Sequence, residues 1–178
     1  MSVAQRNLAR SENQPNAEVI DLGVQWDGGA PLPHVVSDGS RAILICRASD
    51  TSPGWDQLVT RGVSASDASA FPLIRFSFRG CRSIRFGSPG DEVLSGHPLW
   101  GSGLEFYEAH IVRNSAWAKE IEAIRSVHSG YRGPTETTHY LFAFHDETFE
   151  ALADDVTVEA FEGSLNSALA DAARSIAP

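Results

Sequence analysis

The stretch HYLFAFHDETFEALA, residues 139–153, decides the fold of this chain. An apolar segment precedes His145-Asp146-Glu147, and another apolar segment resumes at Phe149. Apolar runs of this length on both sides of a short polar segment predict two antiparallel strands joined by a tight turn. The turn would hold a histidine and several carboxylates at the end of a rigid strand, where catalytic and binding groups often lie.

Alternation of apolar and polar residues is clearest from Pro72 to Phe86. The apolar residues of one parity are Ile74, Phe76, Phe78, Ile84 and Phe86. Arginines and small residues occupy the other parity, so this segment is typical of a half-buried antiparallel strand. Gly80 interrupts the pattern and marks a bulge, or a tight turn that splits the segment into a hairpin.

Further strands are expected around these two segments. The run Arg41–Ala48 is apolar on both faces and predicts a central strand. Alternating hydrophobic residues between Val19 and Pro33 predict one edge strand, which Asp27-Gly28-Gly29 would close. Strand character also returns at 104–112 and continues after the hairpin through Val158.

Two helices are expected. Asn114 or Ser115 would cap a helix that runs to about Val127, and a second helix would start near Ser164. The buried stripe of the first helix would be Trp117, Ile121 and Ile124, and that of the second Leu165, Leu169, Ala172 and Ile176. Successive strands with two helices and no βαβ rhythm predict an α+β fold with a mainly antiparallel sheet, and a partly closed barrel is the alternative.

Residues 1–17 are polar and aperiodic, and predict a disordered tail before a single globular domain at 18–178. The segment Trp55–Arg61 fits either a strand or a helical turn, and residues 64–70 fit either a loop or a single helical turn. The tail has no apolar signal-peptide core, and the two cysteines make no disulfide framework. These features favour a cytoplasmic protein with reduced thiols.

The 178 residues include 14 basic and 23 acidic ones, which gives a formal net charge of -9. This charge argues against binding to nucleic acid or to an anionic membrane surface. No apolar stretch approaches the roughly 18 residues that a membrane-spanning helix needs.

The first candidate site is the hairpin turn, with His145, Asp146 and Glu150 as candidate catalytic residues. A histidine beside carboxylates can act as a general acid or base, and the same groups can bind a divalent metal. The alternative is a polar turn whose side chains are only solvated. No zinc-binding spacing of His or Cys is present, so no metal ligand is assigned, and the sequence identifies no cofactor.

The second candidate is a row of arginines on one strand face, Arg75, Arg79 and Arg85, with Arg82 close by. Of these, Arg79 and Arg82 would bind a small anionic or polar ligand. The alternative is an ordinary solvent face, paired with acids near the C-terminus. His97 lies in a segment with five glycines and two prolines, residues 87–103, which fits either a lid or a structural Ω-loop. His110 shares parity with Val112 and would point into the core or into a pocket at its edge.

Four phrases of the sequence resemble those of a bacterial protein family to which no activity is attached. They are FRGCRSIRFG at 78–87, GHPLWGSGL at 96–104, NSAW at 114–117 and FHDETFEALAD at 144–154. The resemblance covers about 41–156 and implies a cytosolic bacterial protein of similar size. It transfers no functional residue.

The favoured hypothesis is a pocket for a small polar or anionic ligand, lined by Arg82, His97, His110, His145 and Asp146. It requires that His145 and Arg82 open onto one hollow. A second hypothesis is a protein-interaction domain, of the kind that covers a basic surface on a partner protein. Its acidic face would consist of Glu147, Glu150, Asp154, Asp155, Glu159 and Glu162. A third is an acid–base or metal-assisted enzyme that uses His145 with Asp146 or Glu150.

Overall fold

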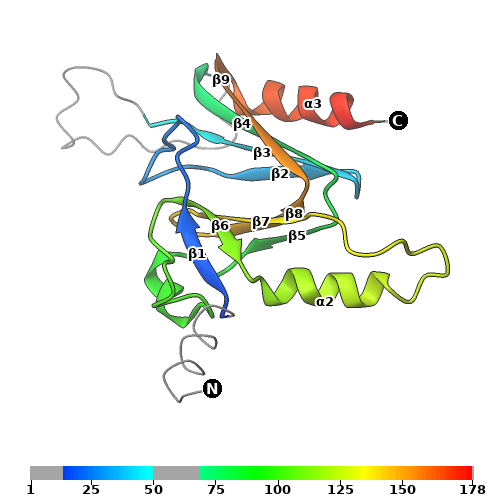
Figure 1. Cartoon of the computed structure of the whole chain (residues 1–178). Helices are drawn as coiled ribbons and strands as arrows, with labels where there is room; N and C mark the ends of the chain where they lie inside the picture. Colours follow the sequence, from blue (N-terminus) through cyan, green and yellow to red (C-terminus); the bar gives the residue numbers. More distant parts are fainter. Residues whose placement is uncertain (1–13, 50–68, 178) are drawn as a thin grey trace.

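The computed structural model describes residues 14–49 and 69–177 (Figure 1). The undecided segment Trp55–Arg61 and most of the segment 64–70 lie outside the described residues, as does most of the expected N-terminal tail. The strands are β1 (Asn16–Val19), β2 (His34–Ser37), β3 (Arg41–Arg47), β4 (Phe71–Arg79), β5 (Ser83–Gly87), β6 (Ala109–Arg113), β7 (Thr138–Ala143), β8 (Thr148–Ala153) and β9 (Asp155–Gly163). The helices are η1 (Asp91–Gly96), α2 (Ala116–Arg125) and α3 (Leu165–Ile176).

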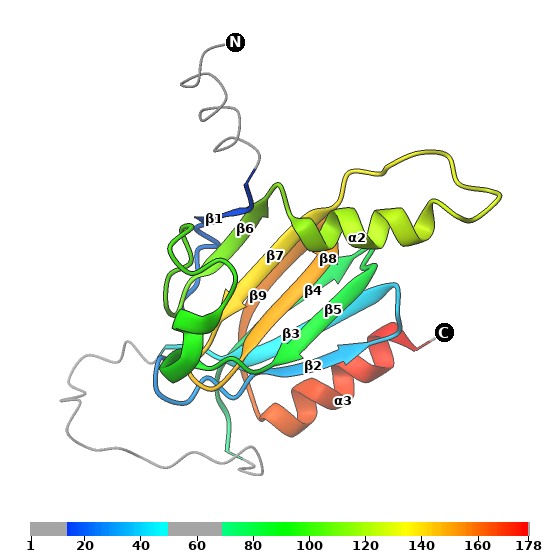
Figure 2. The same cartoon turned by 90° about the horizontal axis from the view of Figure 1, so that it is seen from below.

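The described strands form two antiparallel sheets that pack face to face, with no closed barrel (Figures 1 and 2). One sheet has the order β1-β6-β7-β8-β5 and the other the order β2-β3-β4-β9. Between them, Phe76 and Phe78 of β4 meet Phe142 of β7 and Phe149 of β8. The expected α+β fold with mainly antiparallel strands is therefore confirmed. The alternation of 72–86 correctly identified Ile74, Phe76 and Phe78 as core residues, whereas Phe86 is 44% exposed.

A bulge at Gly80 carries the chain from one sheet to the other. Three residues, 80–82, lie between β4 and β5. On the partner strands β8 and β9, only two residues, Ala153 and Asp154, lie between Leu152, which pairs with Ser83, and Asp155, which pairs with Arg79. Gly80 has φ +60, and a Cβ there would lie 1.9 Å from Asp154 Oδ2. One extra residue with a left-handed glycine bends a strand, which is how strands switch between packed sheets. The bulge predicted at Gly80 is confirmed, and no hairpin forms there.

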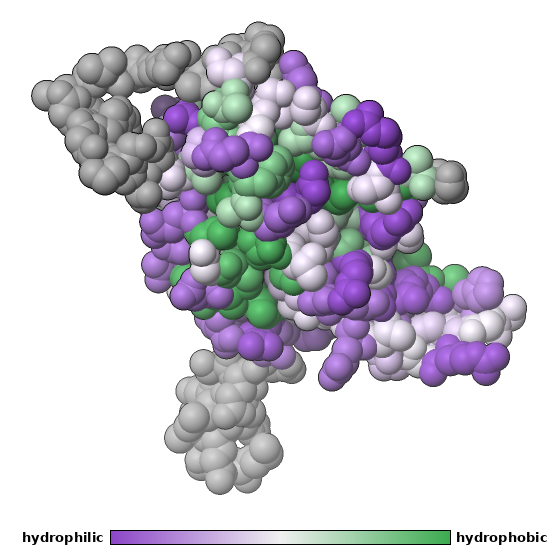
Figure 3. All heavy atoms as spheres, turned by 90° about the horizontal axis from the view of Figure 1, so that it is seen from above, coloured by the Kyte–Doolittle hydropathy of each residue, from purple (hydrophilic) through white to green (hydrophobic). Residues whose placement is uncertain are grey.

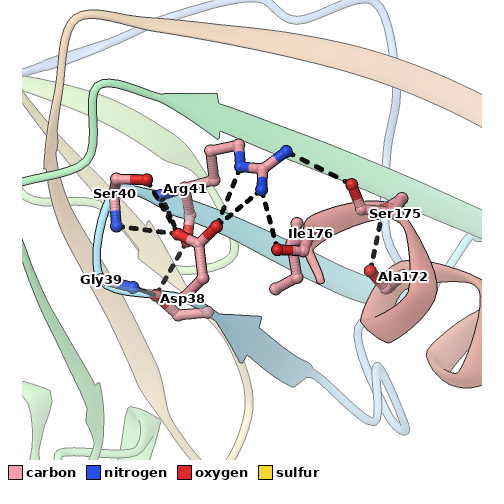
Figure 4. A network of polar contacts seen from close by, with 8 residues as sticks. Asp38, Gly39, Ser40, Arg41, Ala172, Ser175 and Ile176 are labelled. Carbon is pink, nitrogen blue, oxygen red and sulfur yellow. Dashed lines mark hydrogen bonds and ion pairs between the residues drawn. The ribbon is translucent and has the colours of Figure 1, made fainter. Parts of the chain in front are cut away.

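Helix α3 covers the outer face of the four-stranded sheet, where Leu165, Ala168, Ala172 and Ile176 pack on Ile43 and Ile45. Arg41 ties this helix to the β2–β3 turn (Figure 4). Its guanidinium donates to Asp38 Oδ2 and to the carbonyls of Ser175 and Ile176, at 3.3 and 2.8 Å. A cation there satisfies carbonyl groups that the helix C-terminus leaves unpaired.

The outer face of the five-stranded sheet is covered by the segment 88–107 and by the start of α2. Leu94, Leu99 and Leu104 pack on Val112 and Leu141 of the sheet. The glycine-rich segment is therefore packed against the sheet and contains η1. Gly103 has φ +87, and a Cβ there would lie 2.1 Å from the carbonyl oxygen of Ala17 in β1, so this close approach requires glycine.

Several local expectations are wrong. Ile124 of α2 is 60% exposed and Ile121 is only partly buried, because the helix projects away from the sheet beyond Trp117 (Figure 2). The alternating residues Ile20, Leu22 and Val24 pack against the core without forming a strand. Strand β1, which already begins at Asn16, is an edge strand of the five-stranded sheet, and β2 is an edge strand of the four-stranded sheet.

Hydrophobic side chains also reach the surface on the side of the four-stranded sheet. Seen from that side, hydrophobic side chains form a patch that hydrophilic ones border (Figure 3).

Both cysteines, Cys46 and Cys81, are buried and unpaired. Burial raises the pKa of both thiols.

Candidate functional site

A cavity of about 500 Å³ lies over the outer face of the five-stranded sheet, between the start of α2 and the segment 97–102. Besides Gln14, Ser102 and Glu120, its polar lining includes Arg85, His97, Ser115, His139 and Glu150, and Trp117 forms part of its apolar wall. These groups come from two strands of the sheet's centre, one edge strand, one helix and one loop. The fold therefore brings together side chains that are distant in sequence.

Three of these side chains form a hydrogen-bonded chain. Ser115 Oγ lies 2.8 Å from His139 Nδ1, and His139 Nε2 lies 2.8 Å from Glu150 Oε2. A carboxylate can only accept, so Nε2 carries a proton. When the ring is neutral, Nδ1 accepts a hydrogen bond from the serine hydroxyl. The three residues are 7%, 4% and 7% exposed, so the chain lies at the floor of the cavity.

The β7–β8 hairpin places the histidine and the carboxylate. His139 faces Leu152 and Glu150 faces Leu141, so the two are diagonal neighbours on the outer face of the sheet. Long side chains reach across such a diagonal. The inner face at the same level carries Tyr140 and Ala151 of the core.

A sharp strand-to-helix turn places the serine. Strand β6 ends at Arg113, Asn114 has φ +54, and α2 begins at Ala116. Ser115 is the N-cap, and its Oγ accepts the backbone N–H of Ala118 at 3.0 Å. The N-cap predicted at Asn114 or Ser115 is therefore Ser115, and capping fixes its hydroxyl beside His139.

Charge around Glu150 is balanced on several sides. Burial raises the pKa of Glu150, but the hydrogen bond from His139 and the charges of His139, His97 and Arg85 outweigh it, so the net shift is downward. Arg85 Nη1 lies 3.7 Å from Glu150 Oε1, and its guanidinium stacks 4.2 Å above the Trp117 ring. Burial lowers the pKa of His97, which favours its neutral form.

Of the residues expected from the sequence, His97 and Glu150 line this cavity. Glu150 was expected to orient His145, but its partner is His139. His110 is fully buried beside the sheet, where its Nε2 accepts the N–H of Glu105 at 3.0 Å and its Nδ1 has no partner among the described residues. It is not among the residues that line the cavity.

His145 belongs to a separate cluster at the hairpin tip. Its Nδ1 lies 2.7 Å from Asp91 Oδ2, and the Tyr107 hydroxyl donates to the same oxygen. The hydrogen bond to Asp91 is the main reason that the pKa of His145 is raised. Asp146 is exposed and is not the hydrogen-bond partner of His145.

Arg79 and Arg82 lie at the bulge, away from the hairpin tip. Arg82 donates to Asp154 at 2.6 Å and to Thr135 at 2.8 Å, and Arg79 pairs with Asp155. The backbone N–H of Arg82 donates to the carbonyl of Leu152, which lies at the opposite end of the β7–β8 pair from His145. The expectation that His145 and Arg82 open onto one hollow is therefore wrong.

The arginines expected to form one row divide between the sheets. Arg75 and Arg79 lie on the four-stranded sheet, and Arg85 lies on the five-stranded one. Arg75 pairs with Glu159 at 3.1 Å, which matches the alternative in which arginines pair with acids near the C-terminus. The same pairs neutralise much of the acidic face that the interaction hypothesis required, and Glu150 is buried away from it.

The sequence does not indicate Ser115, His139 or Trp117 as site residues, and it places Arg85 only in the row of arginines. A signal was available for His139 and Glu150, because the predicted hairpin places both on one face. Ser115 was identified only as a helix cap, since no serine-hydrolase motif surrounds it. No local pattern indicates that α2 lies beside β7 and β8.

Comparison with models of protein families, with curated protein sequences and with solved structures finds no match to this chain. Within residues 14–49 and 69–177, no group of three or more His, Cys, Asp and Glu side chains is arranged to hold a metal ion. No helix in the same residues has the length and apolar character needed to cross a membrane.

Proposed function

We propose that the cavity beside Arg85 and Trp117 binds a small molecule that has a carboxylate or similar polar head and an apolar body. The observation that carries this proposal is the convergence of Arg85, His97, Ser115, His139 and Glu150 on one cavity of about 500 Å³. Cavities of roughly 300–1,000 Å³ with a few convergent polar groups on apolar walls are typical small-molecule sites.

Arg85 supports an anionic head group. Its side chain is 52% exposed, and one of its nitrogens faces Glu150 at 3.7 Å, which leaves further N–H donors of the guanidinium for a ligand. Stacking on Trp117 holds the guanidinium plane in place. A planar fork held in this way suits a carboxylate, which accepts two parallel hydrogen bonds.

The walls support an apolar body. Trp117, Leu99 and Val112 line the cavity together with Pro98. Glu150 accepts a hydrogen bond from His139 and lies 3.7 Å from Arg85, whose positive charge offsets that of the carboxylate. The proposal keeps the class of ligand expected from the sequence and assigns it to a different set of residues.

The test is a thermal-shift and calorimetric titration with butyrate, benzoate and phenylacetate. We expect at least one of them to raise the melting temperature in a concentration-dependent way, since a ligand that binds only the folded state stabilises it. Arg85→Gln should abolish the shift. Arg79→Gln, which changes an exposed arginine outside the cavity, should leave it unchanged.

Absence of saturable binding by all three acids would contradict the proposal. So would binding that Arg85→Gln and Arg79→Gln reduce equally, because a general charge effect would then explain it. Trp117 fluorescence offers a second readout, since a bound ligand changes the surroundings of this ring.

A further inference from the structure

Ser115, His139 and Glu150 are connected in the order that nucleophilic catalysis by serine requires. The hydroxyl donates to one ring nitrogen of the histidine, and the other nitrogen donates to a buried carboxylate. Such sites are recognised by geometry and role rather than by position in the sequence. The ring nitrogens that face serine and carboxylate are Nδ1 and Nε2, respectively, and both distances are 2.8 Å.

Ser115 is also accessible from the cavity and retains an electron pair for attack. A hydroxyl has one donor proton and two acceptor lone pairs. The proton faces His139, and one lone pair accepts the N–H of Ala118, so the other lone pair remains available. The residue is part of the cavity lining.

The first turn of α2 supplies donors for a developing oxyanion. The first N–H groups of a helix have no acceptor within it. In α2, Ser115 Oγ takes the N–H of Ala118, and the carbonyl of Ser115 takes that of Lys119. The N–H groups of Ala116 and Trp117 have no intrahelical acceptor, and both residues line the cavity beside Ser115.

We infer that Ser115 is the nucleophile of an ester hydrolase whose substrates are esters of small carboxylic acids. This inference rests on the proposed binding of such acids in the same cavity, because they are the products of the reaction. Arg85 and the apolar walls would hold the substrate, and Ser115, His139 and Glu150 would carry the chemistry.

The reaction proceeds in two balanced steps. Ser115 Oγ forms a bond to the ester carbonyl carbon, its proton passes to His139 Nδ1, and the carbonyl electron pair moves onto oxygen. The bond to the leaving alcohol then breaks, and the alcohol takes the proton from His139. Water attacks the acyl group in the same way, so the acid is released and Ser115 regains its proton.

Glu150 acts through His139 and is a positioning residue. Its carboxylate holds Nε2–H, which keeps Nδ1 as the acceptor and stabilises the imidazolium that forms during each step. Glu150→Gln should therefore lower kcat and leave KM unchanged. A residue with only a structural role would not produce that split.

The test uses the full-length protein with 4-nitrophenyl butyrate as substrate and a fluorophosphonate as a covalent serine probe. We expect hydrolysis above the buffer rate and a probe adduct that mass spectrometry maps to Ser115. Ser115→Gly should lose both, with a decrease of about 100-fold or more in kcat/KM, and His139→Asn should lower it by a similar factor.

Glycine is chosen because an N-cap position tolerates glycine much better than alanine, so the variant should remain folded. The matched control is Ser164→Gly, which removes the N-cap hydroxyl of α3, a helix on the other sheet. It should hydrolyse the ester at the wild-type rate.

The two proposals can fail separately. If one of the three acids binds but the wild-type protein neither hydrolyses the ester nor reacts with the probe, this inference is overturned and the binding proposal stands. Reaction at another residue, or full activity in Ser115→Gly, also overturns it. If neither binding nor turnover occurs, both proposals fall.

Discussion

His139 Nε2 and Glu150 Oε2 lie 2.8 Å apart across the β7–β8 pair, although neither residue faces the other in the strand register. Both side chains are almost fully buried. Since the removal of one member leaves the other as an unpaired buried polar group, we expect Glu150→Ala to lower the free energy of unfolding by about 3 kcal/mol. Urea denaturation measures this change.

The control for that substitution is Glu159→Ala, which removes an exposed carboxylate paired with Arg75. It should cost less than about 1 kcal/mol. The double variant His139→Leu/Glu150→Leu should lose less than the sum of its two single variants, because the second change removes an already unpaired group. Additive losses would show that the two residues do not interact.

The same pair gives stability a dependence on acid pH. The pKa of Glu150 in the folded protein lies below its ordinary value of 4.5. A carboxylate of this kind contributes stability above pH 4.5, and the contribution is lost as the pH falls from there through the folded pKa. Denaturation curves between pH 7 and pH 3 should therefore show a steeper loss for the wild type than for Glu150→Gln. Parallel curves would contradict this assignment.

The cluster of His145, Asp91 and Tyr107 at the hairpin tip predicts a dependence of stability on pH with the opposite sign. The pKa of His145 is raised above 6.5, mainly by its hydrogen bond with Asp91. The stability from this group is fully present below pH 6.5 and is lost as the pH rises through the folded pKa. We expect Asp91→Asn to lower the pKa of His145, as followed by NMR titration of the ring. Glu92→Gln, which changes a neighbouring carboxylate of weaker influence, should shift it less.

Two glycines of the glycine-rich segment have a left-handed backbone. Substituting each by alanine distinguishes the stability cost of backbone strain from the cost of steric overlap. Gly101 has φ +77 with nothing within 4 Å of its missing Cβ, whereas a Cβ at Gly103 would lie 2.1 Å from the Ala17 carbonyl. Gly101→Ala should cost roughly 1–2 kcal/mol from backbone strain alone. Gly103→Ala should cost more and should also increase hydrogen exchange in β1. Equal costs at the two positions would contradict the close approach.

The link between Arg41 and the end of α3 predicts a moderate loss of stability. Arg41→Ala removes hydrogen bonds to two helix-terminal carbonyls and to Asp38. Its side chain is 44% exposed, so we expect a loss of about 1 kcal/mol rather than the full value of a buried charged hydrogen bond. Arg174→Ala, which breaks a surface pair within α3, should cost less than about 0.5 kcal/mol.

Local sequence patterns were sufficient for much of the fold. The alternation of 72–86 and the hairpin at 139–153 identified β4, β5, β7 and β8 because side-chain parity reflects which face of a strand is buried. The cap at Ser115 marked the start of α2. The assignment of strands to two sheets could not be read in this way, because it depends on the bend at Gly80.

The candidate site was less accessible to sequence reading. The sequence indicates Glu150 as a site residue but suggests His145, its nearest histidine in sequence, as its partner. In the structure its partner is His139, with which it makes a diagonal contact across the strands. Ser115 reaches His139 only because α2 begins over the sheet. Contacts that cross the sheet depend on tertiary packing, and a single sequence contains no direct signal for them.

The bend at Gly80 and its counterpart at Asp154 also determine how the chain can be divided. Strand β1 belongs to one sheet, β2–β4 to the other, β5–β8 again to the first, and β9 again to the second. Among the described strands, no contiguous fragment contains every strand of one sheet and none of the other. A truncation designed to isolate either sheet would therefore remove strands of that sheet or keep strands of the other, so we expect the two sheets to unfold together.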